Sequence, residues 1–291
     1  MLKYIVITNT FNRPIDLVEK SITKSLAQHP TPAKMILIDQ NTNALVFNKD
    51  ITENLIFTSQ SIQTKIVSEA RNDAKLEIDS NYDWIVFCDD DGYMSENYAQ
   101  VLQKEIEKNP EVEIFAGGIL RDDNNKFYTP RHSYGGDLNK FQNTKLLMGS
   151  NFAIKKETFL KLEKFDIRFG AGSFWGSGEE TDFAWKAYFN KIPMKYVKEL
   201  TIYHIPPYAG DFVHSIKKAF KYGLGKGALV SKWLFFKRHP IVLYEFLEML
   251  IIPFIKTFTS LIKFQFKEVP YYMASFLSRI IGMIYFIFVR K

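Results

Sequence analysis

The sequence is poor in cysteine and has no long apolar segment near its start. Cys88 is the single cysteine among 291 residues, so no disulfide can form within the chain, which fits a reducing compartment. Because Cys88 lies in an apolar run, we expect a buried, inert thiol rather than a nucleophile. The apolar run 4–7 is too short for a signal peptide, and none is expected. Fixed-period repeats and low-complexity tracts are also missing.

Acidic residues are scarce toward the end of the chain. The net charge is +6, but residues from Asp211 onward hold 13 Lys and Arg against only 4 Asp and Glu, and the rest of the chain is slightly acidic. This asymmetry indicates an anionic partner for the C-terminal part, either a membrane or a nucleic acid. The same part is rich in apolar runs, which fit lipid better, so we expect no nucleic-acid partner.

A short apolar run, Trp84–Cys88, ends abruptly in three carboxylates, Asp89–Asp91. The run predicts a strand buried on both faces, and its carboxyl end is where open α/β sheets bind ligands. Three adjacent acids repel one another unless a cation offsets them. Asp89 and Asp91 point the same way in extended chain and would give Mg²⁺ or Mn²⁺ two hard oxygen ligands. A solvated acidic turn is the alternative interpretation.

The first 200 residues alternate between strand and helix patterns. Apolar runs predict strands over 2–8, 35–39, 56–58, 84–88, 147–154, 194–197 and 200–204. Helical spacing predicts helices over 14–27, 68–78, 95–108, 157–163 and 179–190, with Ser68 as a cap. Residues 121–143 are predicted as a loop over the site. The alternation predicts an α/β fold with a mostly parallel, Rossmann-like sheet and helices on both faces.

We expect a domain boundary near Pro206-Pro207. It would divide the chain into an α/β domain, residues 1–207, and a basic, apolar region, residues 208–291. Helices are predicted there over 212–236, 241–266 and 271–289.

The predicted C-terminal helices are amphipathic. Lys256, Ser260, Lys263 and Lys267 form one polar stripe, and Arg279 is the one charge in 271–289. A span needs about 20 apolar residues, and a central Arg costs about 2.5–3.5 kcal/mol. We therefore favour helices that lie in the plane of the membrane, with a single span second. A helical subdomain packed on the α/β domain or on a second subunit is the remaining alternative.

Seven short elements occur in order over residues 3–204. They are Thr10-Phe11-Asn12-Arg13-Pro14, Asp39-Gln40-Asn41-Thr42, Ala70-Arg71-Asn72, Asp89-Asp90-Asp91, Gly149-Ser150-Asn151 with Phe165-Asp166, Gly178-Glu179-Glu180-Thr181-Asp182, and Tyr203-His204. Together they resemble the family 2 glycosyltransferases, which bind nucleotide sugars on the GT-A fold. Two elements depart from the family pattern. Gln40-Asn41 replaces an acidic pair, and Glu180 stands where Asp is usual.

The resemblance implies a role for each matched residue. The donor-binding residues would be Thr10, Asn12, Arg13, Asp39, Arg71, Asn72, Asp89 and Asp90. The ligands of a Mn²⁺ or Mg²⁺ ion would be Asp89, Asp91 and His204. The acceptor side would include Asn151, Asp166, Trp175 and Gly178. The general base would be Glu180, with Glu179 and Asp182 as alternatives.

Several of these residues also have ordinary structural interpretations. Asp39 would suit a turn at a strand end. Arg71 would suit a surface ion pair, whereas in its functional role it would contact the diphosphate or orient Asp89. Trp175 would suit the core or the packing of a lid. The glycines of 169–178 would suit a close approach of the backbone to a sugar, a bending lid, or an ordinary flexible loop.

The resemblance implies an inverting, metal-dependent glycosyltransferase. It would move a sugar from a nucleotide-diphosphate donor to a glycan acceptor. The expected membrane attachment would suit a polyprenyl-linked or other lipid-linked acceptor, so cell-surface polysaccharide synthesis is the leading hypothesis. The enzyme would then act at the cytoplasmic face of the membrane. A non-catalytic carbohydrate-binding or scaffolding protein with a degenerate site is the alternative. A sugar nucleotidyltransferase is a further one, but it would need a glycine-rich phosphate loop where residues 9–13 hold no glycine.

Overall fold

The computed structural model describes residues 2–74, 81–206 and 211–289. The chain forms two compact units. Unit 1 comprises residues 1–65, 69–165 and 183–206, and unit 2 comprises 66–68, 166–182 and 207–291. Residues 166–182, which include the glycine-rich stretch, are therefore grouped with the C-terminal helices. The predicted boundary at 207 stays a prediction.

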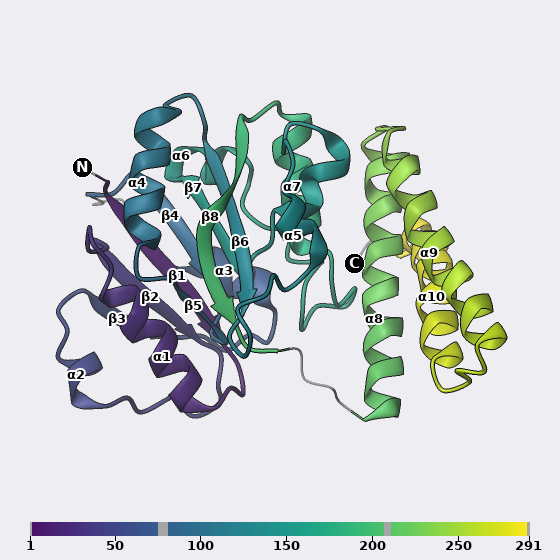
Figure 1. The fold of residues 1–291 in the computed structure, drawn as a ribbon, viewed down its shortest axis with the longest axis horizontal. Coiled ribbons are helices and arrows are strands. Elements are labelled where there is room, and N and C mark those ends of the chain that lie inside the picture. The colour runs from purple at the N-terminus through teal and green to yellow at the C-terminus, as the bar shows by residue number, and fades with distance from the viewer. Residues whose placement is uncertain (1, 75–80, 207–210, 290–291) are drawn as a thin grey trace. The chain divides into compact units, whose positions relative to one another are not determined.

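Unit 1 is built on one mixed sheet, eight-stranded in the part of the chain that is described, with the order β3-β2-β1-β4-β7-β6-β8-β5 (Figure 1). The strands are β1 (Tyr4–Thr10), β2 (Lys34–Asp39), β3 (Phe57–Ser61), β4 (Trp84–Cys88), β5 (Gly92–Met94), β6 (Ile114–Arg121), β7 (Asn151–Lys155) and β8 (Met194–His204). Strands β1 to β4 pair in parallel, as do β6 and β8. Strand β7 is antiparallel to both neighbours, and β5 is antiparallel to β8.

Helices cover both faces of this sheet, as the sequence predicts. Tyr4 and Val6 of β1 point into one core with α1 (Ile15–Leu26), α2 (Lys49–Thr52) and α4 (Tyr98–Lys108). Ile5 and Ile7 point into the other. Three helices cover that second face, namely α3 (Val67–Asp73), α6 (Lys156–Lys161) and α7 (Glu179–Phe189). Cys88 is buried in the first core, and burial raises the pKa of its thiol, as expected for an inert residue.

Other details differ from the sequence prediction. The predicted loop 121–143 contains α5 (Pro130–Tyr134) and the start of a 3₁₀ helix, η1 (Phe141–Leu146). The two predicted strands at 194–204 form one strand, β8, because a register shift between Gly117 and Gly118 absorbs the break in pattern. Ser68 lies inside α3 and is not its cap, and residues 75–78 of that predicted helix lie outside the described residues.

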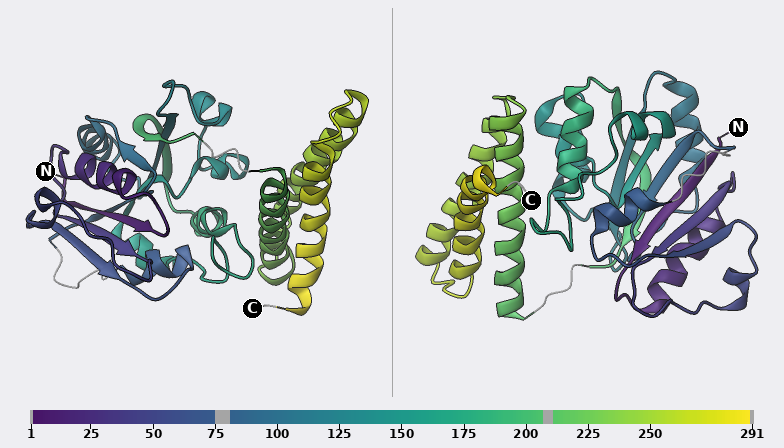
Figure 2. Two further views of the ribbon diagram at one scale, coloured as in Figure 1. Left: turned by 90° about the horizontal axis from the view of Figure 1, so that it is seen from below. Right: turned by 180° about the vertical axis from the view of Figure 1, so that it is seen from behind.

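Unit 2 contains the three predicted C-terminal helices. They are α8 (Phe212–Ser231), continued by a π-helical turn, η2 (Lys232–Phe236), then α9 (Val242–Ile262) and α10 (Val269–Phe288). Helices α8 and α10 run side by side (Figure 2). Their backbones touch, since a Cβ on Gly227 would lie 2.0 Å from the Arg279 carbonyl oxygen. Among the described helices, α10 alone is long and apolar enough to cross a membrane by length and composition.

Gly117 gives a direct test of the sheet. A Cβ at this position would lie 1.9 Å from the Leu200 carbonyl oxygen, which backbone cannot accommodate. We expect Gly117→Ala to lower the free energy of unfolding by about 2–3 kcal/mol through overpacking, measured by chemical denaturation. The matched control is Gly92→Ala, whose Cβ would lie 3.2 Å from its nearest atom and should cost less. Equal losses in the two variants would contradict the packing described for β6 and β8.

Candidate active site

The acidic turn after β4 is brought beside the end of β8 by a strand pairing. Residues Asp89–Asp91 connect β4 to β5, and Gly92 of β5 is paired with His204, the last residue of β8. The backbone N–H of Ile205 donates to the Asp91 carbonyl at 3.1 Å and extends this pairing. Two segments that are far apart in sequence therefore meet at one edge of unit 1.

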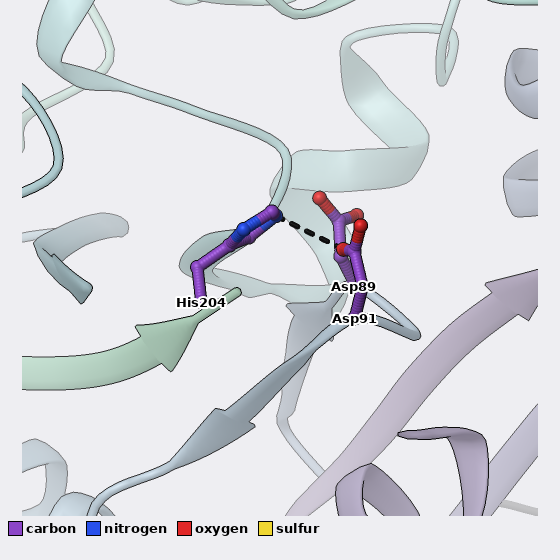
Figure 3. Close-up of side chains that lie close together, drawn as sticks. All are labelled: Asp89, Asp91 and His204. Atoms are coloured by element: carbon purple, nitrogen blue, oxygen red, sulfur yellow. Dashed lines mark ion pairs between the residues drawn. The ribbon is translucent and has the colours of Figure 1, made fainter. Parts of the chain in front are cut away.

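Asp89, Asp91 and His204 point toward one another (Figure 3). Each offers one ligand atom, and these atoms all lie within 4.8 Å of one another. His204 Nε2 lies 2.9 Å from Asp91 Oδ1, while Nδ1 lies 2.8 Å from the Ile205 carbonyl oxygen. A neutral His204 would carry its proton on Nδ1 toward that carbonyl, which leaves Nε2 as the ligand. Two carboxylates and one imidazole are a donor set that fits a divalent cation.

Two arginines offset the three adjacent carboxylates. Arg13 lies 3.2 Å from Asp90 Oδ1 and 2.8 Å from Asp91 Oδ2. The buried Arg71 donates to Asp89 Oδ1 at 2.9 Å, so it orients this carboxylate, as the sequence allowed. The acids therefore do not need a metal to coexist, but their remaining oxygens still converge with His204.

Burial and neighbouring charges shift the pKa values of Asp90, Asp91 and His204. Burial raises the pKa of Asp90 to about 6 in spite of the Arg13 charge. Burial would also raise the pKa of Asp91, but the hydrogen bond and charge of His204, with Arg13, hold it below its usual value. Burial opposes the charged form of His204, yet the bond to Asp91 and the charges of Asp91 and Asp89 raise its pKa to about 9. His204 is therefore protonated at pH 7, and a metal ion bound there would displace that proton.

Other predicted donor-binding residues hold the loops around the cluster. Asp39 is fully buried, and its carboxylate accepts hydrogen bonds from the backbone N–H groups of Asn41 and Leu45 at 3.0 and 2.7 Å. Asn12 donates its backbone N–H to the Asn41 side chain at 2.7 Å. The turn role of Asp39 is thus visible, and its predicted contact with a nucleotide base stays a prediction.

Of three more residues of the predicted site, Thr10 and Asn151 are buried and Asn72 is half-buried. Thr10 is fully buried at the end of β1. The Asn72 side chain donates to the Phe165 carbonyl oxygen at 2.8 Å and accepts from the Phe165 backbone N–H at 2.9 Å. Asn151 accepts from Tyr98 and donates to two backbone carbonyls at the register shift of β6 and β8. These contacts are structural, and the predicted donor and acceptor roles of these residues stay predictions.

The acidic motif forms the first turn of α7. Glu179 and Glu180 are partly exposed, whereas Asp182 is fully buried. Asp182 Oδ1 accepts hydrogen bonds from Lys232 Nζ at 2.5 Å and from Trp233 Nε1 at 2.7 Å. Asp182 is therefore held by a buried cation and an indole.

The remaining acceptor-side residues also lie in unit 2. Asp166 is paired with Arg168 and Lys232, which hold the pKa of its carboxyl well below the usual range against the effect of burial. Trp175 is buried against Tyr285 and Phe286 of α10. Its predicted stacking on a sugar stays a prediction and would require the ring to leave this packing.

Gly178, which precedes the acidic motif, has a φ of +101°, a backbone conformation that favours glycine. Its predicted place on the acceptor side stays a prediction.

Sequence reasoning did not find Lys232 or Trp233. The apolar run that follows Lys232 indicates that this lysine is buried. A fully buried lysine is nearly always paired with an acid, so the sequence indicates an ion pair there.

The raised pKa of His204 predicts that metal affinity depends on pH. Protons compete with Mn²⁺ for the imidazole below a pKa of about 9. We therefore expect affinity to rise about tenfold for each pH unit between pH 6.5 and 8.5. Titration calorimetry with MnCl₂ would measure this slope. His204→Gln removes the competing proton and should bind more weakly with a flatter slope. An unchanged slope in that variant would exclude His204 as a ligand.

The chain is similar in structure to S. aureus TarS 1-349, with a TM-score of 0.56 and 16% identity over 80% of this chain and 66% of that one. It is also similar to GalNAc-T7 with UDP, GalNAc and Mn²⁺, with a TM-score of 0.56 and 15% identity over 77% of this chain and 47% of that one. The chain thus spans two thirds or less of these proteins. No curated protein sequence matches it.

At these identities the likeness to solved structures shows the fold alone, and that fold is the GT-A type expected from the sequence. The sequence profile of glycosyl transferase family 2 matches residues 5–176, which is more than half of the chain and includes Asp89 and Asp91. The match ends before the acidic motif at 179–182. The chain belongs to glycosyl transferase family 2.

Proposed function

We propose that this family 2 glycosyltransferase is an inverting, metal-dependent enzyme that uses a nucleotide-diphosphate sugar. The observation that carries the proposal is the convergence of Asp89, Asp91 and His204 within 4.8 Å at the ends of β4 and β8. A divalent cation held there would stabilise the charge that develops on the leaving diphosphate. The imidazole is a softer donor than a carboxylate, so we expect Mn²⁺ to be preferred over Mg²⁺.

The arginines of the site support a diphosphate ligand. Arg13 and Arg71 lie within 3.2 Å of the acidic cluster, and Arg13 is one-third exposed. A guanidinium so placed can exchange its carboxylate partner for phosphate oxygens without leaving the site. GalNAc-T7, the similar structure, is described with UDP and Mn²⁺, so UDP is the nucleotide to test first.

The reaction needs one carboxylate to accept a proton. The bond from sugar C1 to the diphosphate oxygen breaks, a bond from C1 to the acceptor oxygen forms on the opposite face, and the acceptor hydroxyl loses its proton. We assign that proton to Glu180, at the motif position that the family resemblance gives to the base. Asp182 is a poorer candidate because its carboxylate is buried and already accepts from Lys232 and Trp233. Glu179 remains the alternative.

The assignment of the base predicts a difference between two neighbouring glutamates. Glu180→Gln should lower kcat for release of nucleoside diphosphate by about 10²–10⁴-fold, since a general base contributes that much. Binding of UDP with Mn²⁺ should stay unchanged in this variant. Glu179→Gln, the matched control, should lose less than about tenfold, below the range of a general base. The assays use the full chain with a panel of nucleotide sugars. A larger loss in Glu179→Gln would move the base to that residue.

A membrane-associated acceptor is the second part of the proposal. Helices α9 and α10 reverse the pattern of a water-soluble protein. They bury polar and small residues, namely Thr257, Ser260, Ser275, Ser278 and Gly282. They expose large apolar side chains, including Ile252 at 53% and Ile262 at 76%, and Phe264, just after α9, is 79% exposed. Contiguous apolar surface of this kind marks a protein or membrane contact.

Charge favours a membrane over a protein partner. Lys256, Lys263 and Lys267 are exposed on and just after α9, close in sequence to its exposed apolar residues. Basic residues beside apolar ones suit an anionic lipid surface. An enzyme bound in this way would meet a lipid-linked glycan acceptor, and the cytoplasmic face, where anionic lipids and nucleotide sugars occur together, is the location we propose.

The membrane proposal predicts which lysines matter. We expect the wild-type chain to float with vesicles of neutral and anionic lipid. Replacing Lys256, Lys263 and Lys267 together by Gln should weaken binding to anionic vesicles about 100-fold, at about 1 kcal/mol per lysine. Neutral vesicles should bind the variant as before. The control replaces Lys104, Lys108 and Lys161, exposed lysines of unit 1, with the same charge change. Equal weakening in both triple variants would contradict the assignment of this surface.

A further inference from the structure

Lys232 is a buried cation in the C-terminal helical region. It is the first residue of the π-helical turn η2, and its side chain is 7% exposed. Its ammonium lies 2.8 Å from Asp166 Oδ2 and 2.5 Å from Asp182 Oδ1. The next residue, Trp233, donates its indole N–H to the same oxygen of Asp182 at 2.7 Å. One short turn of chain therefore holds two carboxylates that come from outside the C-terminal helices.

Burial makes the pairing of these groups energetically important. A buried carboxylate without a partner is strongly unfavourable, and a buried ion pair requires good geometry to compensate desolvation. Asp166 has a second partner, because Arg168 donates to both of its carboxylate oxygens, at 3.0 and 2.6 Å. Asp182 is fully buried, and the Lys232 ammonium lies against its Oδ1. Lys232 therefore offsets the buried charge of Asp182 at close range.

Asp182 transmits this restraint to the glutamates of the acidic motif. Its backbone N–H donates to the Gly178 carbonyl at 2.8 Å, so Asp182 closes the first turn of α7. Residues Glu179 and Glu180 lie within that same turn. Because one helical turn is rigid once its hydrogen bonds form, fixing the Asp182 side chain fixes the direction in which the two glutamates leave the helix.

The segment before the motif is held by the same helices. Ser177 donates its hydroxyl to the Tyr222 carbonyl of α8 at 2.9 Å. Gly225 of α8 touches this segment so closely that a Cβ would lie 2.6 Å from the Trp175 carbonyl oxygen. Trp175 packs against Tyr285 and Phe286 of α10. Residues 175–182 therefore contact α8, η2 and α10.

We propose that Lys232 is a positioning residue for transfer, acting through Asp182 on the glutamate that takes the acceptor proton. The inference rests on the proposed function and adds a specific task for the C-terminal helical region. That region does not merely attach the enzyme to a membrane. It supplies the cation that fixes the first turn of α7, which carries Glu179 and Glu180. A chain that ended near residue 207 would lack this cation.

The test compares two lysines of the same segment in the full chain. Lys232→Met removes the buried cation, and Lys237→Met removes an exposed one five residues later. Release of nucleoside diphosphate from UDP-N-acetylglucosamine, UDP-glucose and GDP-mannose gives kcat and KM, and calorimetry gives the affinity for UDP with Mn²⁺. We expect Lys232→Met to lower kcat by at least 30-fold, with KM and UDP affinity within twofold of wild type. Lys237→Met should match wild type.

A nuclear magnetic resonance measurement reports on the contact itself. The indole ¹⁵N–¹H signal of Trp233 should move in Lys232→Met, while that of Trp84, in β4, should not. A loss of kcat without this shift, or a kcat within threefold of wild type, would overturn the inference. A wild-type chain inactive on every donor would overturn the proposed function and this inference together.

Lys232→Met can fail to fold, because it leaves Asp182 charged and buried. Thermal unfolding would reveal this, and the variant that combines Lys232→Met with Asp182→Asn removes both charges. If Lys232 positions the catalytic turn, the double variant folds and kcat stays at least 30-fold low, with KM unchanged. If Lys232 only neutralises a buried charge, the double variant regains wild-type kcat, which overturns the inference.

Discussion

Electrostatic repulsion among three adjacent carboxylates is the constraint on which unit 1 depends. Asp89, Asp90 and Asp91 are gathered at the end of a buried strand, where water cannot screen them fully. Arg13 and Arg71 reduce the repulsion, and His204 adds a third positive group when protonated. In the proposed function, a divalent cation would replace the His204 proton, and a diphosphate would replace carboxylates as the partner of the arginines.

In unit 2, a second buried charge binds the acidic segments to the C-terminal helices. The ammonium of Lys232 holds Asp182 and Asp166, while Gly225 and Ser177 bring the preceding loop against α8. The C-terminal helices expose apolar side chains on their outer surface and bury small polar ones between them. In our account, one group of helices therefore has two tasks. It binds a membrane, and it holds the segment that carries the proposed base.

The sequence predicts the α/β fold well because each strand is a short apolar run with clear ends. It also predicts that the acids at 89–91 and His204 meet, since the resemblance orders the motifs. It does not predict the short strand β5, whose three residues carry no periodic pattern, although the pairing of β5 with β8 brings the acidic turn beside His204. It misses Lys232 for a different reason. The apolar run after Lys232 indicates that this lysine is buried, but its ion-pair partners depend on tertiary packing, which neither local propensity nor periodicity records.

The central claim is that Asp89, Asp91 and His204 hold a divalent cation on a nucleoside diphosphate. Anomalous X-ray diffraction at the manganese edge, from crystals of the full chain grown with MnCl₂ and UDP, tests it most directly. The account predicts one anomalous peak within bonding distance of Asp89, Asp91 and His204, beside the diphosphate of UDP. Ordered UDP with no peak at this cluster, or a peak bonded elsewhere, would contradict it.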